Sequence, residues 1–330
     1  MSTVAIVILN YNGENFLRQF LPAVIKNSER ANIIVADNAS TDQSIEILKT
    51  EFPTVHLIQL KDNFGFCGGY NRALQEVKTD YYVLLNSDVE VTANWLQPLI
   101  TLLDERPSVA AVQPKIKSFH HKEYFEYAGA GGGFIDSLGY PFCRGRIFDE
   151  VEKDLGQYND IKEVFWATGA CMVVRSELYH QLGGFDEDFF AHMEEIDLCW
   201  RLKRQGHAIY YVGDSTVYHV GGGTLSKLNP RKTYLNFRNG LSLLTKNLPL
   251  TALLWKLPFR ILLDDVATLR FLLTGQGKHA RAIVSAHLDF FSKLGSDLRK
   301  RTSSHNTRLT GIYPGLLIWM HFIKKKKPSI

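Results

Sequence analysis

The chain has 330 residues, which corresponds to one large domain or to two domains of ordinary size. Hydrophobic residues make up 45% of the sequence and charged residues 22%, and a chain of this length and composition can fold without a disulfide or a structural metal. These values exclude a disordered chain, a collagen and a coiled coil. The four cysteines show no CxxC spacing and no cluster with histidine, which indicates reduced thiols in a cytoplasmic protein.

Charge is distributed unevenly along the chain, although the net charge is only +4. Residues 1–239 contain 23 Lys and Arg against 30 Asp and Glu, whereas residues 240–330 contain 15 against 4. A mildly acidic body followed by a strongly basic tail predicts that the tail meets an anionic partner, either a membrane surface or a nucleic acid.

The first part of the chain alternates between short apolar runs and amphipathic stretches. The run at 4–9 has no basic region before it and no cleavage site after it, so we expect a buried strand and not a signal peptide. Further apolar runs predict strands at 32–36, 55–60, 81–85 and 109–113. Stretches of helical periodicity separate the strands at 14–26, 42–50, 68–78 and 94–104. This alternation predicts an α/β fold with a mostly parallel sheet that helices cover on both faces.

Polar loops follow the first four predicted strands. They contain Asn10-Tyr11-Asn12-Gly13, Asp37-Asn38-Ala39-Ser40-Thr41-Asp42, Asn63 to Asn71 with Gly65, Gly68 and Gly69, and Asn86-Ser87-Asp88. Any one loop could be ordinary turn chemistry, because Asn, Asp and Gly dominate turns. Ligands of open α/β sheets bind at the carboxyl ends of the strands, so the four loops together predict a shallow polar crevice along that edge.

The alternation is lost between residues 118 and 160. The glycines from Gly129 to Gly133 do not match a dinucleotide-binding GxGxxG motif, so we expect a flexible flap or loop over the crevice. A second structured block follows. In it we expect an apolar segment at Val164 to Val174, a helix at 194–205, a short strand at 208–212 and a turn at 219–223.

The tail from residue 240 is helical and apolar but is repeatedly interrupted by Lys, Arg and Pro, and no stretch reaches the ~20 apolar residues that span a bilayer. Its last apolar run, Ile312 to Ile323, ends in Lys324-Lys325-Lys326-Lys327. This pattern predicts an interfacial helix with a polybasic anchor for anionic lipid. The alternative is a solvated basic terminus.

Asp88 is the first candidate for chemistry, because it ends a very hydrophobic strand and faces the open crevice. One carboxylate flanked by the amide of Asn86 suits Mg²⁺ or Mn²⁺ whose shell is completed by phosphate oxygens and water. The alternative is a helix N-cap, but Thr92 is better placed to cap the helix that follows.

Glu194, Glu195 and Asp197 open the predicted helix at 194–205. Acids in a first turn complement the helix dipole, which is one explanation for them. The aromatic segment before them indicates another, because a carboxylate near apolar groups has a raised pKa and can act as a general base. Glu195 and Asp197 lie ~200° apart around a helix, so they cannot share that role. His219 is a further candidate, either as a structural histidine or as a partner of metal or diphosphate.

In this order, the motifs resemble glycosyltransferase family 2. The matching residues are Asn10 to Gly13, Asp37 to Asp42, Asn63 to Asn71, Asn86 to Asp88, Gly184-Phe185-Asp186-Glu187 and Glu194-Glu195-x-Asp197-Leu198. The resemblance covers roughly residues 3–240, and within the family it is strongest to the bacterial rhamnosyltransferase-like branch. It implies a GT-A fold, a nucleoside-diphosphate sugar as donor, a divalent cation (Mg²⁺ or Mn²⁺) and inversion at the anomeric carbon.

The resemblance also implies roles for single residues. Asn10 and Tyr11 would line the nucleoside pocket, Asp37 would bind the pyrimidine base, and Asn63 and Asn71 would flank the donor. The expected donor site is completed by Asn12, Asn38, Gly68, Asn86 and Ser87. Asp88 matches the second acid of the family's DxD metal motif, with Asn86 in place of the first, and His219 would assist at the metal. Glu195 or Glu194 would be the base.

These features predict an inverting glycosyltransferase that uses dTDP-rhamnose or a UDP-sugar. Its acceptor would be a hydroxyl of a cell-envelope glycan or a lipid-linked saccharide, reached at the cytoplasmic face of a membrane that the basic tail binds. Two alternatives remain open. A sugar-1-phosphate nucleotidyltransferase would need basic residues directly after the first strand, and a nucleic-acid-binding module would need aromatic residues among its basic ones.

We therefore expect two regions. Residues 1–239 would form the GT-A catalytic domain, with a nucleotide-sugar half at about 1–115, a flap at 118–160 and an acceptor and base half at about 161–239. Residues 240–330 would form a basic amphipathic helical extension at the membrane surface, with no nucleic acid as partner.

Overall fold

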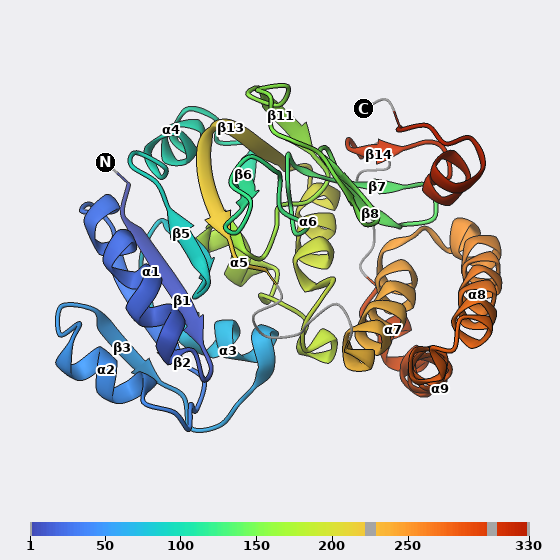
Figure 1. The fold of residues 1–330 in the computed structure, drawn as a ribbon, viewed down its shortest axis with the longest axis horizontal. Helices are drawn as coiled ribbons and strands as arrows, with labels where there is room; N and C mark the ends of the chain where they lie inside the picture. The colour runs from blue at the N-terminus through green and yellow to red at the C-terminus, as the bar shows by residue number, and fades with distance from the viewer. Residues whose placement is uncertain (1, 222–228, 302–308, 329–330) are drawn as a thin grey trace.

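In a computed structural model of the chain, residues 2–221, 229–301 and 309–328 are described. A central nine-stranded sheet forms the body, a second five-stranded sheet lies beside it, and three long helices pack at the C-terminal end (Figure 1). The predicted α/β architecture is confirmed, and so is the helical extension.

The N-terminal part of the sheet is parallel, in the order β4-β1-β2-β3. These strands are β1 (Val4–Asn10), β2 (Asn32–Asp37), β3 (His56–Gln59) and β4 (Tyr81–Asn86). The helices between them are α1 (Glu14–Asn27), α2 (Ser44–Thr50) and α3 (Gly65–Ala73). The register pairs Asn10 with Asp37 and Leu9 with Asn86, so the polar loops after the strands meet at one edge, as the alternation predicts.

The sheet continues beyond β4 through strands of mixed direction. They are β12 (Cys171–Arg175), β6 (Val109–Ser118), β13 (Ala208–His219) and β11 (Ile161–Val164), with β5 (Val89–Val91) paired to β13. The apolar segment expected at 164–174 is thus two strands joined by a turn. The strand expected at 208–212 extends to His219, which pairs with Val89 and so lies beside Asp88. The turn expected at 219–223 falls partly outside the described residues.

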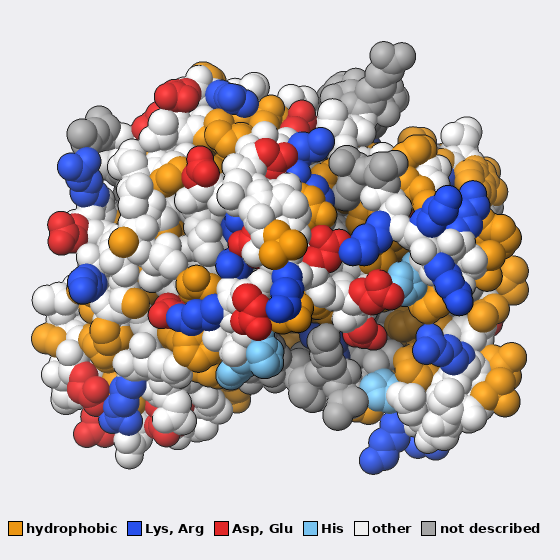
Figure 2. Space-filling view, turned by 45° about the horizontal axis from the view of Figure 1, so that its top comes forward, with side chains coloured by type: hydrophobic (Ala, Val, Ile, Leu, Met, Phe, Trp, Pro, Cys, Tyr) orange, Lys and Arg blue, Asp and Glu red, His pale blue; other side chains and the backbone are white. Residues whose placement is uncertain are grey.

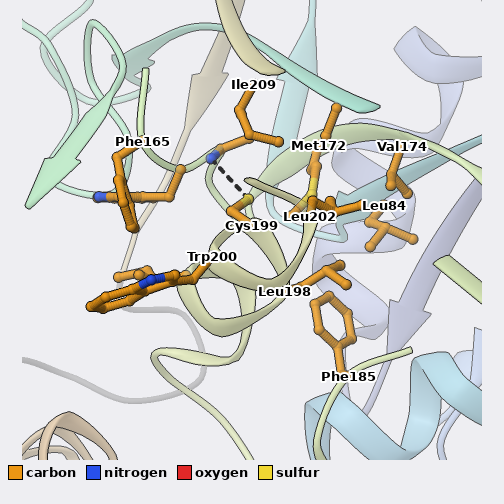
Figure 3. Packing of buried hydrophobic residues seen from close by; sticks show 14 of the residues in the cluster. Leu84, Phe165, Met172, Val174, Phe185, Leu198, Cys199, Trp200, Leu202 and Ile209 are labelled. Carbon is orange, nitrogen blue, oxygen red and sulfur yellow. Dashed lines mark hydrogen bonds between the residues drawn. The ribbon is translucent and has the colours of Figure 1, made fainter. Parts of the chain in front are cut away.

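Two hydrophobic clusters cover the two faces of the central sheet, because successive strand residues point to opposite faces. Helices α1 and α4 (Gln97–Glu105) pack on one face. On the other face, Leu198 and Leu202 of helix α6 (Glu194–Arg204) lie against Leu84 and Met172 of the sheet (Figure 3). This packing fixes the position of α6, and therefore of the acids at its first turn.

Residues 118–160 form most of the second sheet, which corrects the expectation of a flexible flap. Its strands are β7 (Gly133–Asp136), β8 (Pro141–Cys143), β9 (Arg146–Ile147) and β10 (Glu150–Val151). Phe134 and Phe142 are buried between the elements. The backbone of Gly133 lies so close to Trp166 that a Cβ atom would come within 2.2 Å of its ring. The glycine cluster therefore serves close packing at this position.

Helices α7 (Pro230–Asn247), α8 (Leu250–Leu273) and α9 (Gly277–Arg299) pack against one another as a unit, which we call the helical unit. Helix α7 is continuous across residue 239. The expected boundary there falls inside a helix whose middle contacts the catalytic part, through Arg238 and Asn239. Helix α5 (Ser176–Gln181) completes the body.

The apolar run at 312–323 does not form the expected single interfacial helix. Ile312 and Tyr313 form strand β14, parallel to β7, and the helical part is confined to residues 317–323, of which Trp319–Ile323 form one π-helical turn. Pro314 and Gly315 separate the two pieces, since neither residue favours a helix. Among the described residues, we find no helix with the length and hydropathy needed to cross a membrane.

Candidate active site

The carboxyl ends of β1 and β2 are tied together by side-chain hydrogen bonds. Asn10 Nδ2 donates to Asp37 Oδ1 at 3.0 Å and to Ser40 Oγ at 3.2 Å. The Asn12 backbone N–H donates to Ser40 Oγ at 2.9 Å, and Asn12 Oδ1 accepts from the Thr41 N–H at 2.7 Å. Asn10 and Asp37 are buried, and Asn10 Oδ1 has no hydrogen-bond partner. This edge is a rigid polar rim with an acceptor that is still free.

Tyr11 and Gly13 lie next to this rim, the first exposed to solvent and the second packed closely against its neighbours. Tyr11, the first residue after β1, is 45% exposed. A Cβ atom at Gly13 would lie 2.3 Å from Asn10 Oδ1 and 3.6 Å from Ser87 Oγ. Only glycine fits at position 13, and Ser87 therefore lies next to the first loop.

A second network links the loops after β2 and β3. Asn38 Nδ2 donates to Asn63 Oδ1 at 3.0 Å and to the carbonyl of Gly65 at 3.1 Å. Asn63 Oδ1 also accepts from the Gly65 N–H at 2.9 Å. Asn38 and Asn63 thus hold the start of α3 against the crevice edge. Their contact with a donor remains a prediction.

Asn71 and Gly68 lie farther along α3 and contact a different part of the protein. Asn71 Oδ1 accepts from the Tyr179 hydroxyl at 2.7 Å and from the Phe185 N–H at 2.9 Å, while its Nδ2 donates to the Phe185 carbonyl at 2.8 Å. A Cβ at Gly68 would meet Arg72. The amide of Asn71 therefore anchors the segment that leads to α6, and a donor contact for either residue stays a prediction.

Asp88, His219 and Glu126 form a buried chain of charged groups. His219 Nε2 lies 3.2 Å from Asp88 Oδ1, and His219 Nδ1 lies 3.1 Å from Glu126 Oε2. Burial alone would lower the pKa of His219, but the two carboxylates outweigh it and raise the pKa to about 10. Burial would raise the pKa of Asp88 and of Glu126, yet their contacts with His219 hold both pKa values below the ordinary range.

The arrangement of these groups fits a divalent cation. Ligand atoms next to one another in an octahedral shell lie about 3 Å apart, since each bond is about 2.1 Å long. Asp88 Oδ1 and His219 Nε2 have that separation, although without a cation it is the ion pair of a protonated His219, so a cation would have to displace the Nε2 proton. Glu126 faces the other ring nitrogen, as a carboxylate does behind many metal-binding histidines. In the described part of the chain, no group of three or more His, Cys, Asp or Glu side chains could hold a metal alone, so substrate oxygens and water would have to complete the shell.

Glu194 and Glu195 stand at the start of α6, directly after a strained turn. Phe190, His192 and Met193 have φ values of 63°, 69° and 72°, which non-glycine residues rarely adopt. One carboxylate oxygen of each glutamate, Oε2, is buried without a hydrogen-bond partner. Strained backbone together with unpaired buried carboxylates is typical of a functional site.

Burial raises the pKa of both glutamates. The pKa of Glu195 is raised to about 7, whereas Glu194 is more deeply buried and also faces the charge of Glu195, which raises its pKa further. Glu194 therefore holds its proton to higher pH than Glu195. Of the two, Glu195 is the better general base near neutral pH, because it is partly exposed and ionises there.

The turn from Thr168 to Ala170 connects the Asp88 side of the site to the glutamates. The Asn86 N–H donates to the Ala170 carbonyl at 3.0 Å, which ties the turn to the strand end before Asp88. The Thr168 hydroxyl donates to the carbonyl of Ala128, whose N–H donates to Glu126. On the other side, a Cβ at Gly169 would lie 3.9 Å from Glu194 Oε1. The expected convergence of Asp88 and the glutamates is thus supported by a short, continuous set of contacts.

Asn239 of α7 holds the strained turn from outside, and the sequence analysis did not identify it. Its Nδ2 donates to the carbonyls of Phe189, Ala191 and His192 at 3.0, 2.9 and 2.7 Å. Arg238 adds hydrogen bonds to the carbonyls of Asp188 and Phe189 at 2.7 and 3.0 Å. An asparagine inside a predicted helix could have indicated such a role, because asparagine is a poor helix former and its side chain tends to form hydrogen bonds with backbone groups.

Two other ionisable groups near the site are either paired or uncharged. Asp197 is paired with Arg201 at 2.8 Å and Lys246 at 2.9 Å, which gives it the bracing role expected for the acid opposite Glu195. Burial lowers the pKa of His192 to about 4, so its ring is neutral. Glu126 and His192 are further site residues that the sequence patterns did not reveal.

The comparisons with known proteins identify the family. The family model described as "Glycosyl transferase family 2" matches residues 5–183. An N-acetylglucosaminyl-diphospho-decaprenol L-rhamnosyltransferase of Mycobacterium tuberculosis is 26% identical over 230 residues, which cover 65% of this chain and 75% of that protein. The rhamnosyltransferase WbbL of Escherichia coli K12 is 25% identical over 220 residues, which cover 63% of this chain and 80% of WbbL.

Two solved structures with similar folds contain nucleotides. The mannosyltransferase PcManGT of Pyrobaculum calidifontis, in complex with GDP-Man and Mn²⁺, superposes with a TM-score of 0.54 at 14% identity, over 88% of this chain and 87% of that one. GalNAc-T7 with UDP, GalNAc and Mn²⁺ gives a TM-score of 0.56 at 17% identity, over 74% of this chain and 48% of that one. At these identities the likeness shows the fold, which is GT-A.

Proposed function

Because this chain belongs to glycosyltransferase family 2, with a GT-A fold and relatives that are rhamnosyltransferases, we propose that it moves L-rhamnose or a hexose from a nucleoside-diphosphate donor to an acceptor hydroxyl. The donors favoured are dTDP-rhamnose and UDP-sugars. The observation that carries the proposal is the contact of the turn at 168–170 with both the Asp88 side and Glu194. It supports one cleft with a cation site and a base.

In the proposed reaction, Glu195 accepts the proton of the acceptor hydroxyl. The hydroxyl oxygen forms a bond to the anomeric carbon on the face opposite the diphosphate. The bond between that carbon and the diphosphate oxygen breaks, and its electron pair leaves with the nucleoside diphosphate. One displacement of this kind inverts the anomeric configuration and leaves the proton on Glu195.

Other residues would bind and orient the donor. Asn10, Tyr11 and Asp37 would contact the nucleoside, with Asn12, Asn38 and Asn63 next to them, and Asn86 and Ser87 would face the diphosphate. A divalent cation held by Asp88 and His219 would neutralise charge that develops on the departing diphosphate. Glu126 would keep the His219 ring in the orientation that directs Nε2 toward Asp88.

A donor screen tests this proposal. The purified chain would be mixed with dTDP-rhamnose, UDP-hexoses, UDP-N-acetylhexosamines or GDP-mannose, each with and without Mg²⁺ or Mn²⁺, and the unfolding temperature measured. We expect one donor to raise it in the presence of the cation. Asp88→Ala should abolish this shift. If no nucleotide sugar raises the unfolding temperature and the protein hydrolyses none of them, the proposal is contradicted.

The acceptor we propose is a hydroxyl of a cell-envelope glycan or of a lipid-linked saccharide at the cytoplasmic face of a membrane. The support is the name of the M. tuberculosis relative, which acts on a diphospho-decaprenol-linked N-acetylglucosamine. A second support is the basic C-terminal region, which carries 15 Lys and Arg against 4 Asp and Glu. Transfer to a short-chain lipid-linked N-acetylglucosamine but not to the free sugar would agree with this acceptor class.

The two alternative functions are less well supported. The first strand is followed by Asn10 to Gly13 with no basic residue, whereas a nucleotidyltransferase has to hold a triphosphate there. Incubation with a sugar 1-phosphate and a nucleoside triphosphate should release no pyrophosphate. A nucleic-acid module would bind RNA in a salt-dependent way, and we expect no such binding beyond nonspecific attraction to the basic residues.

A further inference from the structure

Helix α8 buries an ion pair beside Leu253 and exposes most of its apolar residues. Arg260 and Asp264 are buried in its inner face, where they pair with each other at 3.3 Å. Arg260 also lies over the ring of Tyr140 and donates to the carbonyl of Leu138, so it attaches α8 to the second sheet. A helix on the surface of a globular protein in water normally has the opposite arrangement.

The outer face of α8 is a continuous apolar stripe. Several of its residues expose more than half of their surface: Leu254, Trp255, Leu262, Val266, Leu269, Leu272 and Leu273. Their spacing of three, four or seven residues keeps them on one side of the helix. Asp265 is an exposed acid within this side. An apolar stripe along 24 residues is larger than the isolated hydrophobic residues that most protein surfaces expose.

Helix α9 extends this surface. It exposes Val284, Leu288, Phe291 and Leu298, again at helical spacing, while Ile283, Ala286 and Phe290 are buried toward α7 and α8. Figure 2 shows hydrophobic side chains mixed with Lys and Arg over the end of the molecule where the helical unit lies. We call the exposed apolar residues of α8 and α9 the outer face.

Basic residues surround the outer face. Arg270, Lys278, Arg281 and Arg299 are all exposed on α8, on α9 or in the loop between them. Asp265 is the exposed acid of the two helices, because Asp264, Asp289 and Asp297 are wholly or partly buried. An apolar stripe bordered by cations has the chemistry of a helix that lies in the interface of an anionic bilayer.

We propose that the outer face of α8 and α9 inserts into the surface of an anionic lipid bilayer, with the two helices parallel to the membrane plane. The occupant is a bilayer and not a second copy of the chain, because a second copy would bring the same basic border to the contact and offers only Asp265 as an exposed acid of the two helices to balance it. The contact surface is therefore this pair of helices, and the four C-terminal lysines only strengthen it by long-range attraction.

This surface would place the active site close to the membrane. Asn239 and Arg238 of α7 bind the turn before Glu194, and α7 packs directly on α8 and α9. A bilayer bound on the outer face would thus lie one helix layer away from the base. This consequence rests on the proposed function, whereas the lipid contact itself does not.

Vesicle flotation tests the proposal with the full chain. The vesicles would contain phosphatidylcholine alone or with about 30% phosphatidylglycerol, at low and at high salt. We expect the chain to float with the anionic vesicles. The triple variant Leu262→Gln, Val266→Gln, Leu269→Gln should have an affinity for these vesicles at least about tenfold lower, because three inserted apolar side chains are lost. These side chains are exposed, so the fold should be retained, and circular dichroism would check it.

The matched control is Leu155→Gln with Ile161→Gln, which removes exposed apolar side chains elsewhere on the surface. It should float as the wild type does. Equal loss in both variants, or no loss in the triple variant, would overturn the proposal. Gel filtration gives a further outcome that would overturn it. If the wild type were a dimer and the triple variant a monomer, while both floated equally, the outer face would be an interface between copies.

Tryptophan fluorescence gives a second readout. Trp95, Trp166 and Trp200 are buried, so in a Trp319→Phe background Trp255 is the exposed indole. Anionic vesicles should shift the emission of this protein to shorter wavelength, and Trp255→Phe should remove the shift. An unchanged spectrum in lipid would contradict insertion of α8. Donor-induced stabilisation should be equal in all these variants, so failure of lipid binding and failure of the proposed function are distinguishable.

Discussion

The catalytic part of the chain and the helical unit distribute polar side chains in opposite ways. At the carboxyl ends of the strands, polar residues gather at one edge of the sheet and bind one another, and the apolar strands behind them are buried. In α8, the ion pair of Arg260 and Asp264 is buried and the leucines face outward. The first arrangement serves a small polar ligand in water, whereas the second is stable only if something apolar can cover the outside.

The largest expected effect is in the catalytic part. Glu195→Gln keeps the shape of the side chain but removes the group that accepts a proton, so we expect transfer to fall by about a thousandfold or more. Donor binding, measured by the rise in unfolding temperature, should be unchanged. Glu194→Gln is the matched control, and because Glu194 holds its proton more strongly, its loss should be far smaller. A larger loss in Glu194→Gln would exchange the roles of the two residues.

A second effect concerns the inverted helix. Asp264→Ala leaves Arg260 buried without its carboxylate, and we expect the free energy of unfolding to fall by about 3 kcal/mol. The double variant Arg260→Leu, Asp264→Leu should lose much less, because no uncompensated charge remains. Chemical denaturation of the three proteins measures the difference. If the single and double variants are equally destabilised, packing and not charge holds α8 in place.

Sequence reasoning predicted the parallel half of the fold well because the evidence for it is local. Apolar runs and helical periodicity lie within a few residues of one another, and the carboxyl ends of β1, β2 and β4 then have to meet at one edge. The second sheet was missed because its consecutive strands β7 to β10 are only two to four residues long, too short for a clear alternation, and because its fifth strand β14 lies far away in the chain. Ile312 and Tyr313 look like part of an amphipathic helix until that partner is known.

For the candidate site, too, sequence reasoning found the residues with local signals and missed those that depend on distant contacts. Asp88, Glu194, Glu195 and His219 could be singled out because they stand at strand or helix ends next to unusual neighbours. Glu126 could not, because it lies in a segment without periodicity and acquires its role only when β13 carries His219 to it. The inverted polarity of α8 was equally hidden, since its hydrophobic pattern does not say which side faces the body.

Asn239 links the two regions, and its removal should have a moderate effect. Asn239→Ala frees three carbonyls of the strained turn, so Glu195 would be held less firmly and become better hydrated. We expect kcat to fall about 30-fold with little change in KM for the donor. The apparent pKa of the base should also move down toward 4.5, a shift that a merely structural loss of folded protein would not produce.

Asn239→Asp is the conservative comparison for this positioning residue. A carboxylate at this place cannot donate to the carbonyls of Phe189 and Ala191 and would repel them. It should therefore be as harmful as alanine, despite its similar size. Full activity in either variant would show that α7 and the helical unit do not position the base.

The smallest effect is the pH dependence of the wild type. Burial raises the pKa of Glu195 to about 7, and the base has to be ionised to accept a proton. kcat/KM should therefore rise with pH, from about tenfold below its plateau at pH 6 to a constant value above about pH 8. The thiols of Cys67 and Cys199 also face the glutamates, but burial raises the pKa of both, to about 12 for Cys199, so they stay neutral in this range.

Stability should change in the opposite direction over the same range. An ordinary glutamate in the unfolded chain ionises near pH 4.5, so between that pH and 7 the folded chain holds a proton that the unfolded chain has lost. The contribution of Glu195 to stability therefore falls as pH rises through this window, while activity rises. Glu195→Gln should abolish the activity slope and remove the part of the stability slope that Glu195 contributes, because glutamine does not titrate, whereas the part that comes from Glu194 should remain. An activity profile that is flat from pH 5 to pH 8 in the wild type would mean that the base is an ordinary, hydrated carboxylate and that the burial at the start of α6 has no catalytic role.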